Sequence, residues 1–257
     1  MDESIKFFVG LDAHKDSISV AVCETEREPS RFLGTLGPDM QGVLKTLRKY
    51  GPPQQVSVVY EAGPTGYGLH RELKRRGYRC EIIAPSLIPR RAGERLKTDR
   101  RDCARLAELS RAGELKAIWV PDEAHEAMRN LWRAREDAVN MRLKVRQQIK
   151  AFLLRQDRRY AGKTSWTKMH QRWIHDQRFV HPADQIALTE YQLAVQTAQE
   201  RVQRLTDALQ QATQDWRFEP VVSALRALRG VDTVSAIGLV CEIGDIRRFA
   251  SARQLMG

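Results

Sequence analysis

The sequence lacks the marks of several common protein classes. Its four cysteines, Cys23, Cys80, Cys103 and Cys241, are far apart and form no CxxC pair. A thiolate zinc site is therefore not expected, and this usage is typical of a reducing compartment. No apolar run approaches the roughly 20 residues that span a bilayer, and the acidic start MDESIKFF is unlike a signal peptide. We expect a cytoplasmic protein.

Negative charge is in the minority. The chain has 43 Lys and Arg against 32 Asp and Glu, a formal net charge of +11, and such an excess favours a polyanionic partner, most commonly nucleic acid. Residues 142–172 contain ten cations and one acid, Asp157, and supply +9 of that total. Because acids are nearly absent there, intrahelical salt bridges do not explain the stretch. A solvated basic face without a specific ligand stays open as the alternative.

Two basic clusters are predicted to bind nucleic acid. The first leads into a helix that starts near residue 98. The second is interleaved with tryptophans, on which unpaired bases can stack; the alternative is that these tryptophans pack against neighbouring helices. The predicted residues are Arg90, Arg91, Arg95, Lys97, Arg100 and Arg101 in the first cluster, and Arg142, Lys144, Arg146, Lys150, Arg155, Arg158, Arg159, Lys163, Trp166, Lys168, Arg172 and Trp173 in the second.

The first 112 residues have the pattern of an α/β domain. The expected strands cover 5–24 as a hairpin, 31–36, 56–60 and 80–84, and the expected helices cover 40–50, 67–76 and 98–112. β-branched residues dominate the stretch VSVVY, which predicts a buried strand. Antiparallel strands that are followed by alternating helices and strands predict a mixed sheet covered by helices.

From Pro121 the pattern becomes helical. Apolar residues recur at alternating spacings of three and four in two series, which predicts two long helices that pair as a coiled coil. The series are Leu131, Ala134, Ala138, Met141, Val145, Ile149 and Phe152, and Leu188, Tyr191, Val195, Ala198, Val202, Leu205, Leu209 and Ala212. A helix–turn–helix pattern follows Pro220. The predicted regions are therefore a catalytic domain at 1–112, a coiled-coil region at 113–220 and the start of a further helical domain at 221–257.

Four carboxylates are predicted to converge on one site. Asp12 ends the first strand and Glu61 ends VSVVY, and neighbouring strand ends place their side chains in one crevice. Asp99 and Asp102 share a face of the first helical turn. Oxygen ligands suit Mg²⁺ or Mn²⁺, and two such ions about 3.5–4 Å apart clamp the attacking and leaving oxygens of a phosphodiester. Taken singly, each acid has an ordinary alternative, such as capping a turn or a helix N-terminus.

The histidines give a weaker signal. His14 is close enough to Asp12 in the sequence to approach the acidic site, although the expectation is a surface histidine. The other five, His70, His125, His170, His175 and His181, show no spacing typical of metal ligands.

Three acidic motifs carry a resemblance to a known family. The stretches VGLDAHKDSISVAV, VVYEAGPTGYGLHRELKRRGY and LKTDRRDCARLAEL resemble, in order and spacing, the motifs of the DEDD transposases of the insertion sequence 110 family. The stretch GVDTVSAIGLVCEIGDIRRFASARQLMG resembles the start of that family's second conserved domain. The resemblance implies an RNase H-like, RuvC-like fold, a coiled coil and a C-terminal transposase domain. It also implies an RNA-guided DNA transposase or recombinase whose acidic tetrad falls on Asp12, Glu61, Asp99 and Asp102.

The resemblance further implies partners and a second half of the active site. A noncoding bridge RNA would bind target and donor DNA, and we expect a homo-oligomer, a dimer that assembles into a tetramer on DNA. A nucleophilic serine is implied downstream of Arg248–Ser251. The chain is expected to end before that serine and to be inactive alone; neither Ser235 nor Ser251 is expected to be the nucleophile.

Three rival functions stay open. A RuvC-like structure-specific DNA endonuclease would hydrolyse DNA with the acidic site and no serine. A catalytically inactive nucleic-acid-binding remnant would keep the basic surfaces alone. An actin-like sugar kinase or ATPase also begins with strand, Asp, turn and strand, but the long basic helical region and the missing phosphate-binding glycines argue against it.

Overall fold

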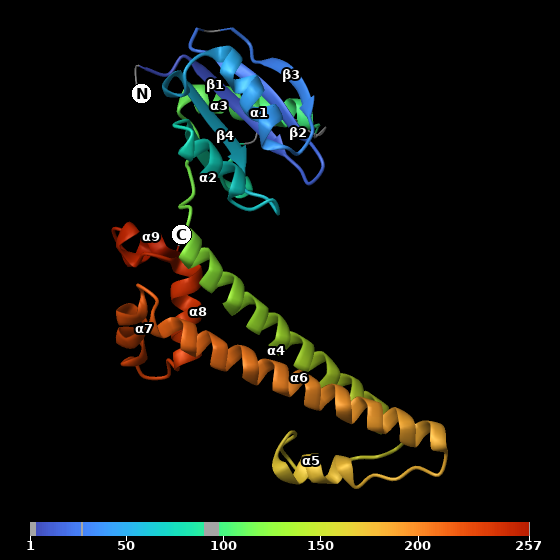
Figure 1. Ribbon diagram of the computed structural model, residues 1–257. Coiled ribbons are helices and arrows are strands. Elements are labelled where there is room, and N and C mark those ends of the chain that lie inside the picture. Colours follow the sequence, from blue (N-terminus) through green and yellow to red (C-terminus); the bar gives the residue numbers. More distant parts are fainter. Residues whose placement is uncertain (1–3, 27, 90–97, 257) are drawn as a thin grey trace. The chain divides into compact units, whose positions relative to one another are not determined.

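The computed structural model describes residues 4–26, 28–89 and 98–256 (Figure 1). The chain divides into two compact units, residues 1–120 and residues 121–257. The domain boundaries predicted at residues 112 and 220 stay predictions. Within the described residues, no helix is long and apolar enough to cross a membrane.

The first unit is built on a five-stranded mixed sheet of order β3-β2-β1-β4-β5. Its strands are β1 (Phe7–Ala13), β2 (Ile18–Glu24), β3 (Arg31–Leu36), β4 (Val56–Glu61) and β5 (Arg79–Ile83). β1, β2 and β3 pair in antiparallel fashion, whereas β4 runs parallel to β1 and β5 runs parallel to β4. The predicted mixed sheet is confirmed. β4 is buried on both faces, as its run of β-branched residues predicts.

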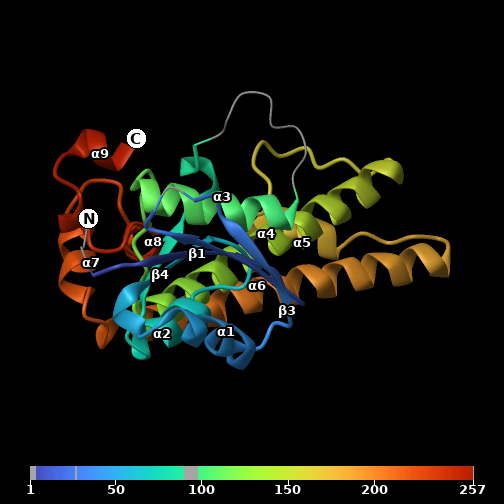
Figure 2. The ribbon, with the colours of Figure 1, turned by 90° about the horizontal axis from the view of Figure 1, so that it is seen from above.

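Helices cover both faces of this sheet. They are α1 (Met40–Leu47), α2 (Gly68–Arg75) and α3 (Asp99–Ala112). Figure 2 shows α3 on one side of the strands and α1 and α2 on the other. α1 and α2 pack with Val9 and Leu11 into the main core, whereas Phe8 packs with Ala107 of α3. Because successive strand residues point to opposite faces, Asp12 lies on the α3 side of β1.

Gly10 permits α3 to lie directly against β1. A methyl group at this position would overlap the carbonyl oxygen of Cys103 and come within 2.7 Å of the Ala107 backbone nitrogen. Both are backbone atoms of α3, so the helix itself would have to move to admit a side chain. Gly10 precedes Asp12 by two residues, and the close approach therefore brings α3 to the end of β1 that carries Asp12.

Two long helices form the body of the second unit. α4 (Glu123–Arg155) and α6 (Pro182–Gln214) run side by side in opposite directions, as Figure 1 shows. Most members of the two predicted apolar series are buried or half-buried, among them Ile149, Leu188 and Val202. Two members are exposed instead: Met141 is 47% exposed, and Ala212 is exposed while Thr213 beside it is buried. The coiled-coil character of the pair stays a prediction.

Polar side chains join the two long helices in their middle part. The Arg135 Nε atom donates to Thr206 Oγ1 at 3.3 Å. Arg142 and Arg146 both donate to Gln199 Oε1, at 3.1 and 3.2 Å. These polar links lie in the middle of the predicted apolar seam, where Met141 is exposed.

Short helices pack at both ends of the long pair. They are α5 (Lys168–His175), α7 (Glu219–Arg226), α8 (Thr233–Ile243) and α9 (Ala252–Met256). At one end, Met128, Leu209 and Ile237 share a core, and the Arg129 Nε atom donates to the Cys241 carbonyl oxygen at 2.8 Å. An arginine on the last carbonyls of α8 satisfies groups that the helix itself leaves without partners. At the other end, α5 packs Ile174 against α4 and α6.

Candidate functional site

Asp12 and His14 are positioned by the end of β1 and by the turn that follows it. The Asp12 side chain is only 15% exposed. The backbone N–H of His14 donates to the Ser17 carbonyl oxygen at 2.8 Å and so closes the turn between β1 and β2. This turn holds the His14 Nε2 atom 3.2 Å from Asp12 Oδ2.

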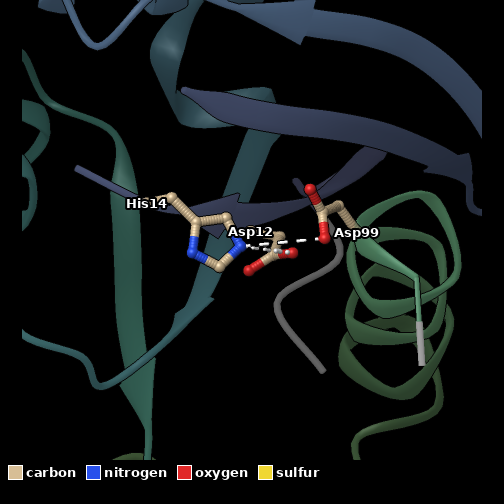
Figure 3. A group of neighbouring side chains, drawn as sticks. All are labelled: Asp12, His14 and Asp99. Carbon is tan, nitrogen blue, oxygen red and sulfur yellow. Dashed lines mark hydrogen bonds and ion pairs between the residues drawn. The ribbon is translucent and has the colours of Figure 1, made fainter. Parts of the chain in front are cut away.

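Asp99 reaches the same place from the start of α3. Thr98 caps this helix, since its hydroxyl oxygen accepts a hydrogen bond from the backbone N–H of Arg101. Asp99 Oδ1 lies 3.8 Å from the His14 Nε2 atom. Asp12, His14 and Asp99 thus each offer one ligand atom, and the three atoms lie within 4.8 Å of one another (Figure 3). Such a group is able to hold a divalent cation.

Asp102 lies one turn further along α3, and its surroundings test whether a divalent cation fits this site. Its Oδ2 atom is buried and has no hydrogen-bond partner among the described residues. A buried carboxylate oxygen without a donor or a cation is costly. Burial also raises the pKa of Asp12; His14 opposes this rise, and the Asp99 and Asp102 carboxylates add to it. A divalent cation would relieve both the missing partner and the repulsion.

Glu61 stands at the matching position of the neighbouring strand. Leu11 pairs with Tyr60 in the parallel ladder, so Asp12 and Glu61 are the next residues of their strands and point to the same face. Within the described residues, Glu61 is not among the three residues whose ligand atoms lie within 4.8 Å of one another. The structure therefore brings Asp12 together with Asp99 and places Asp102 and Glu61 nearby, and the role of all four as ligands stays a prediction.

His14 is the site residue that sequence reasoning set aside. Its side chain is 55% exposed, as a surface histidine should be. It nevertheless contacts both Asp12 and Asp99, because the tight turn folds it back over the strand end. The available signal was the Asp-x-His spacing across the end of β1, which keeps the two side chains close in the chain.

The first basic cluster is described only in part. Arg100 and Arg101 are exposed at the start of α3, and the Arg100 guanidinium lies 5.5 Å from the centre of the Phe32 ring. The remaining predicted members, Arg90, Arg91, Arg95 and Lys97, lie outside the described residues.

The second basic cluster carries charge that no acid neutralises. In the part of the chain that the structure describes, none of its ten cations forms an ion pair. Arg142 and Arg146 bind the Gln199 amide, Lys150 binds Ser165, and Arg158 donates to the carbonyl oxygen of Arg178. The other six are exposed: Lys144, Arg155, Arg159, Lys163, Lys168 and Arg172.

The two tryptophans of this cluster pack within the protein. Trp166 and Trp173 are half-buried against a core that includes Ile149 and Phe152. His170 stacks on Trp173 with ring centres 5.8 Å apart. The packing alternative thus describes much of their surface, and their predicted stacking with bases stays a prediction.

Comparison with known proteins identifies relatives of this arrangement. Residues 9–156 match the model of a transposase family, the DEDD transposases of insertion sequence 110. A Sinorhizobium fredii protein named as a candidate transposase, y4qE, is 46% identical over 252 residues, which cover 97% of this chain and 61% of the relative. The transposase for insertion sequence element IS1533 of Leptospira borgpetersenii is 31% identical over 252 residues, which cover 96% of this chain and 72% of the relative.

The chain thus spans 61% and 72% of the lengths of these two relatives. The region that matches the family model includes all four acids of the predicted tetrad, together with His14 and the start of the second basic cluster. The match covers more than half of the sequence, and the chain therefore belongs to the DEDD transposases of the insertion sequence 110 family.

Proposed function

We propose that this protein is an RNA-guided DNA transposase that cuts and rejoins DNA at a metal-dependent site formed by Asp12, Glu61, Asp99 and Asp102. The observation that carries the proposal is the meeting of Asp12, His14 and Asp99 beside the buried, partnerless oxygen of Asp102. Family membership supplies the reaction class, because the relatives are named as transposases. The mixed sheet, with helices on both faces, is consistent with an RNase H-like, RuvC-like domain.

The donor set fits Mg²⁺ or Mn²⁺. Such ions, when bound, stabilise the charge that develops on the oxygens of a phosphodiester under attack. Asp12, His14 and Asp99 would each offer one ligand atom to such an ion. Asp102 would contribute Oδ2, and Asp99 would contribute a carboxylate oxygen from the first turn of α3. The close backbone contact at Gly10 fixes the position of α3, and so of Asp99 and Asp102, relative to Asp12.

The basic cluster supports nucleic acid as the partner. Its ten cations have no acidic partner in the described residues, so their charge is available to phosphates. We propose that this surface binds a noncoding bridge RNA that pairs with target and donor DNA. Because recombination joins several strands at once, we also propose a homo-oligomer, with dimers that assemble into a tetramer on DNA.

A matched pair of substitutions tests the metal site. Asp12→Asn in the complete element should reduce transposition in cells by at least about 100-fold, because loss of one metal ligand removes several kcal/mol of charge stabilisation. Asp16→Asn is the control: Asp16 is an exposed acid in the same turn and lies outside the ligand group. Transposition of the Asp12→Asn element at the control level would reject the proposed site.

Metal binding is measured separately on the purified chain. Mn²⁺ should raise the melting temperature of the native protein and of Asp16→Asn, but not that of Asp12→Asn. Without metal, Asp12→Asn should melt at the same or a slightly higher temperature, because the substitution removes a half-buried negative charge beside Asp99 and Asp102. An equal response of all three proteins to Mn²⁺ would show that Asp12 is not a ligand.

A further inference from the structure

A cavity of about 640 Å³ lies at the end of the second unit where α5 packs against α4 and α6. Its apolar wall includes Ile149, Ile174 and Val195, and Trp166 and Arg146 also line it. The amides of Gln192, Gln196 and Gln199 form a polar fringe, with Glu200 beside them. A cavity of this size that combines an apolar wall with polar side chains suits a small organic ligand.

Trp166 is held at this cavity in a strained backbone conformation. Its φ angle is +68°, a left-handed value that is rare for a bulky residue. Side chains of α5 fix its backbone on both sides: the Trp166 N–H donates to His170 Nδ1 at 3.0 Å, and Gln171 Nε2 donates to the Trp166 carbonyl oxygen at 2.9 Å. These two hydrogen bonds hold the indole beside the cavity although the backbone conformation is strained.

Arg146 lines the cavity, and Arg142 shares its hydrogen-bond acceptor there. The guanidinium of Arg146 lies over the Trp166 ring, 4.6 Å from its centre. Arg142 and Arg146 donate to the same neutral oxygen, Gln199 Oε1, and neither forms an ion pair within the described residues. Arg146 Nε is buried there without a hydrogen-bond partner. Two adjacent cations with unused donor capacity favour a negatively charged group such as a phosphate.

The remaining hydrogen-bonding groups suit the edge of a base. Gln192 Nε2 is engaged by the Ile174 carbonyl oxygen and Gln196 Nε2 by Glu200, which leaves the two amide oxygens as acceptors. Gln199 uses its oxygen for the arginines, which leaves its amide nitrogen as a donor. Bases present such donors and acceptors once they leave a helix.

We propose that this cavity binds a single unpaired nucleotide, with its base against the apolar wall beside Trp166 and its phosphate near Arg142 and Arg146. The inference rests on the proposed nucleic-acid function and deepens it. The second basic cluster would then recognise an extruded or bulged nucleotide in addition to the negative charge of the phosphates. An unpaired nucleotide in an RNA bulge and one in a DNA strand both present a base edge and a phosphate. The protein would use the cavity to fix one position along the bound strand.

The experiment compares binding of a bulged and a fully paired duplex by the 257-residue chain. The probe is a 16-base-pair RNA hairpin that carries one bulged 2-aminopurine, together with its fully paired counterpart and the DNA equivalents of both. The native chain should bind the bulged RNA roughly 10-fold more tightly than the paired RNA, since one stacked base typically contributes that much affinity. Insertion of the base beside Trp166 should also quench the 2-aminopurine emission.

A cavity-filling variant and a matched control decide the site. Gln196→Trp places a large side chain at the cavity, whereas Gln203→Trp places it two turns further along the same helix, outside the lining. Both glutamines are exposed and each donates to an acid four residues later, so the two changes should perturb α6 equally. Gln196→Trp should bind bulged and paired RNA alike, and Gln203→Trp should keep the native preference.

The outcomes separate the cavity from the wider proposal. If Gln196→Trp keeps the full bulge preference, or if the native chain binds bulged and paired RNA equally tightly, the cavity binds no nucleotide while the RNA function survives. If the native chain binds neither RNA, both proposals fail together. A preference for the bulge in DNA that exceeds the preference in RNA assigns the cavity to a DNA strand.

Discussion

The acidic cluster of the first unit and the basic cluster of the second are built by different structural means. In the first unit, acids gather at the ends of parallel strands and on one helical turn, and a glycine contact between backbones fixes their spacing. In the second unit, unneutralised cations surround the end of a long helical pair, and a tryptophan in a strained conformation is held there by side chains. The first site depends on a contact between two backbones, and the second depends on contacts made by side chains.

The two sites should differ in how well they tolerate substitutions. Backbone atoms in regular elements cannot shift singly, so a site built on them keeps its geometry and tolerates little change. Side chains change rotamer at a lower cost, so a surface built on them adapts to its ligand. A chemical step needs a site of fixed geometry, whereas the binding of a folded nucleic acid benefits from a surface whose side chains adapt. Two glycine substitutions and one pH experiment test the contrast.

The largest effect is expected for Gly10→Ala. The new methyl group would overlap the Cys103 carbonyl oxygen and approach the Ala107 nitrogen, both of which are helix backbone. The cost should be about 3 kcal/mol or more, at the upper end for overpacking. Hydrogen exchange should accelerate in β1 and α3 and stay unchanged in α4. Gly68→Ala is the control, because nothing lies within 4 Å of its added methyl group; equal stability of the two variants would contradict the backbone contact.

A smaller effect is expected for Gly238→Ala in the second unit. The added methyl group would meet the Trp132 indole, with the nearest atom at 2.5 Å. Because a side chain is able to turn away, the destabilisation should be about 1–2 kcal/mol by chemical unfolding. Combining it with Trp132→Phe should recover part of the loss, which a double-mutant cycle measures. If Gly238→Ala costs as much as Gly10→Ala, the contrast between the two units is wrong.

The smallest effect is expected for Glu242→Gln. Arg133 donates two hydrogen bonds of 2.8 Å to Glu242, and these, together with the charges of Arg133 and Arg129, lower the pKa of its carboxyl group. A lowered pKa contributes stability above the unfolded value, here 4.5, that is lost as the pH falls through the folded value. The carboxylate is 38% exposed, so the contribution at pH 7 should stay under about 1 kcal/mol.

Melting temperatures from pH 7 to pH 3 check this expectation. The native protein should exceed Glu242→Gln at pH 7, and the two should converge below pH 4.5. Glu190→Gln, an exposed acid on α6, should follow the native curve throughout. A difference that grows as the pH falls would have the wrong sign and would exclude the ion pair as its cause.

Much of the acidic site was predictable because its signals are local. Asp12 and Glu61 lie at the ends of strands that are predicted by their β-branched residues, and Asp99 follows a threonine that caps a helix. Family motifs led to the same residues, and the family assignment is confirmed. The approach of His14 to Asp12 was considered from the sequence, but its contact with Asp99 was not predictable, because sequence proximity does not determine how a turn folds back. That depends on the hydrogen bond from His14 N–H to Ser17, a property of the turn geometry.

The two long helices of the second unit were predictable, whereas α5 and the contacts between the long helices were not. The spacing of apolar residues gave both long helices, yet it placed Met141 in the seam, where the structure has polar links to Gln199 instead. The periodicity of apolar residues indicates which face of a helix is apolar on average. It does not show where polar contacts replace apolar ones locally. The cavity at Trp166 left no pattern in the sequence, because its walls come from three separate helices.

From the sequence came the strands and helices of the first unit, the two long helices, the acids at the strand ends, the family and the excess of positive charge near residues 142–172. These follow from short-range periodicity, capping and composition, which act between neighbours along the chain. Tertiary structure alone decided that Gly10 admits α3, that His14 joins Asp12 to Asp99, and that Trp166 takes a left-handed conformation beside Arg146. Each of these depends on contacts between residues far apart in sequence or on the exact path of a turn, where packing outweighs local preference.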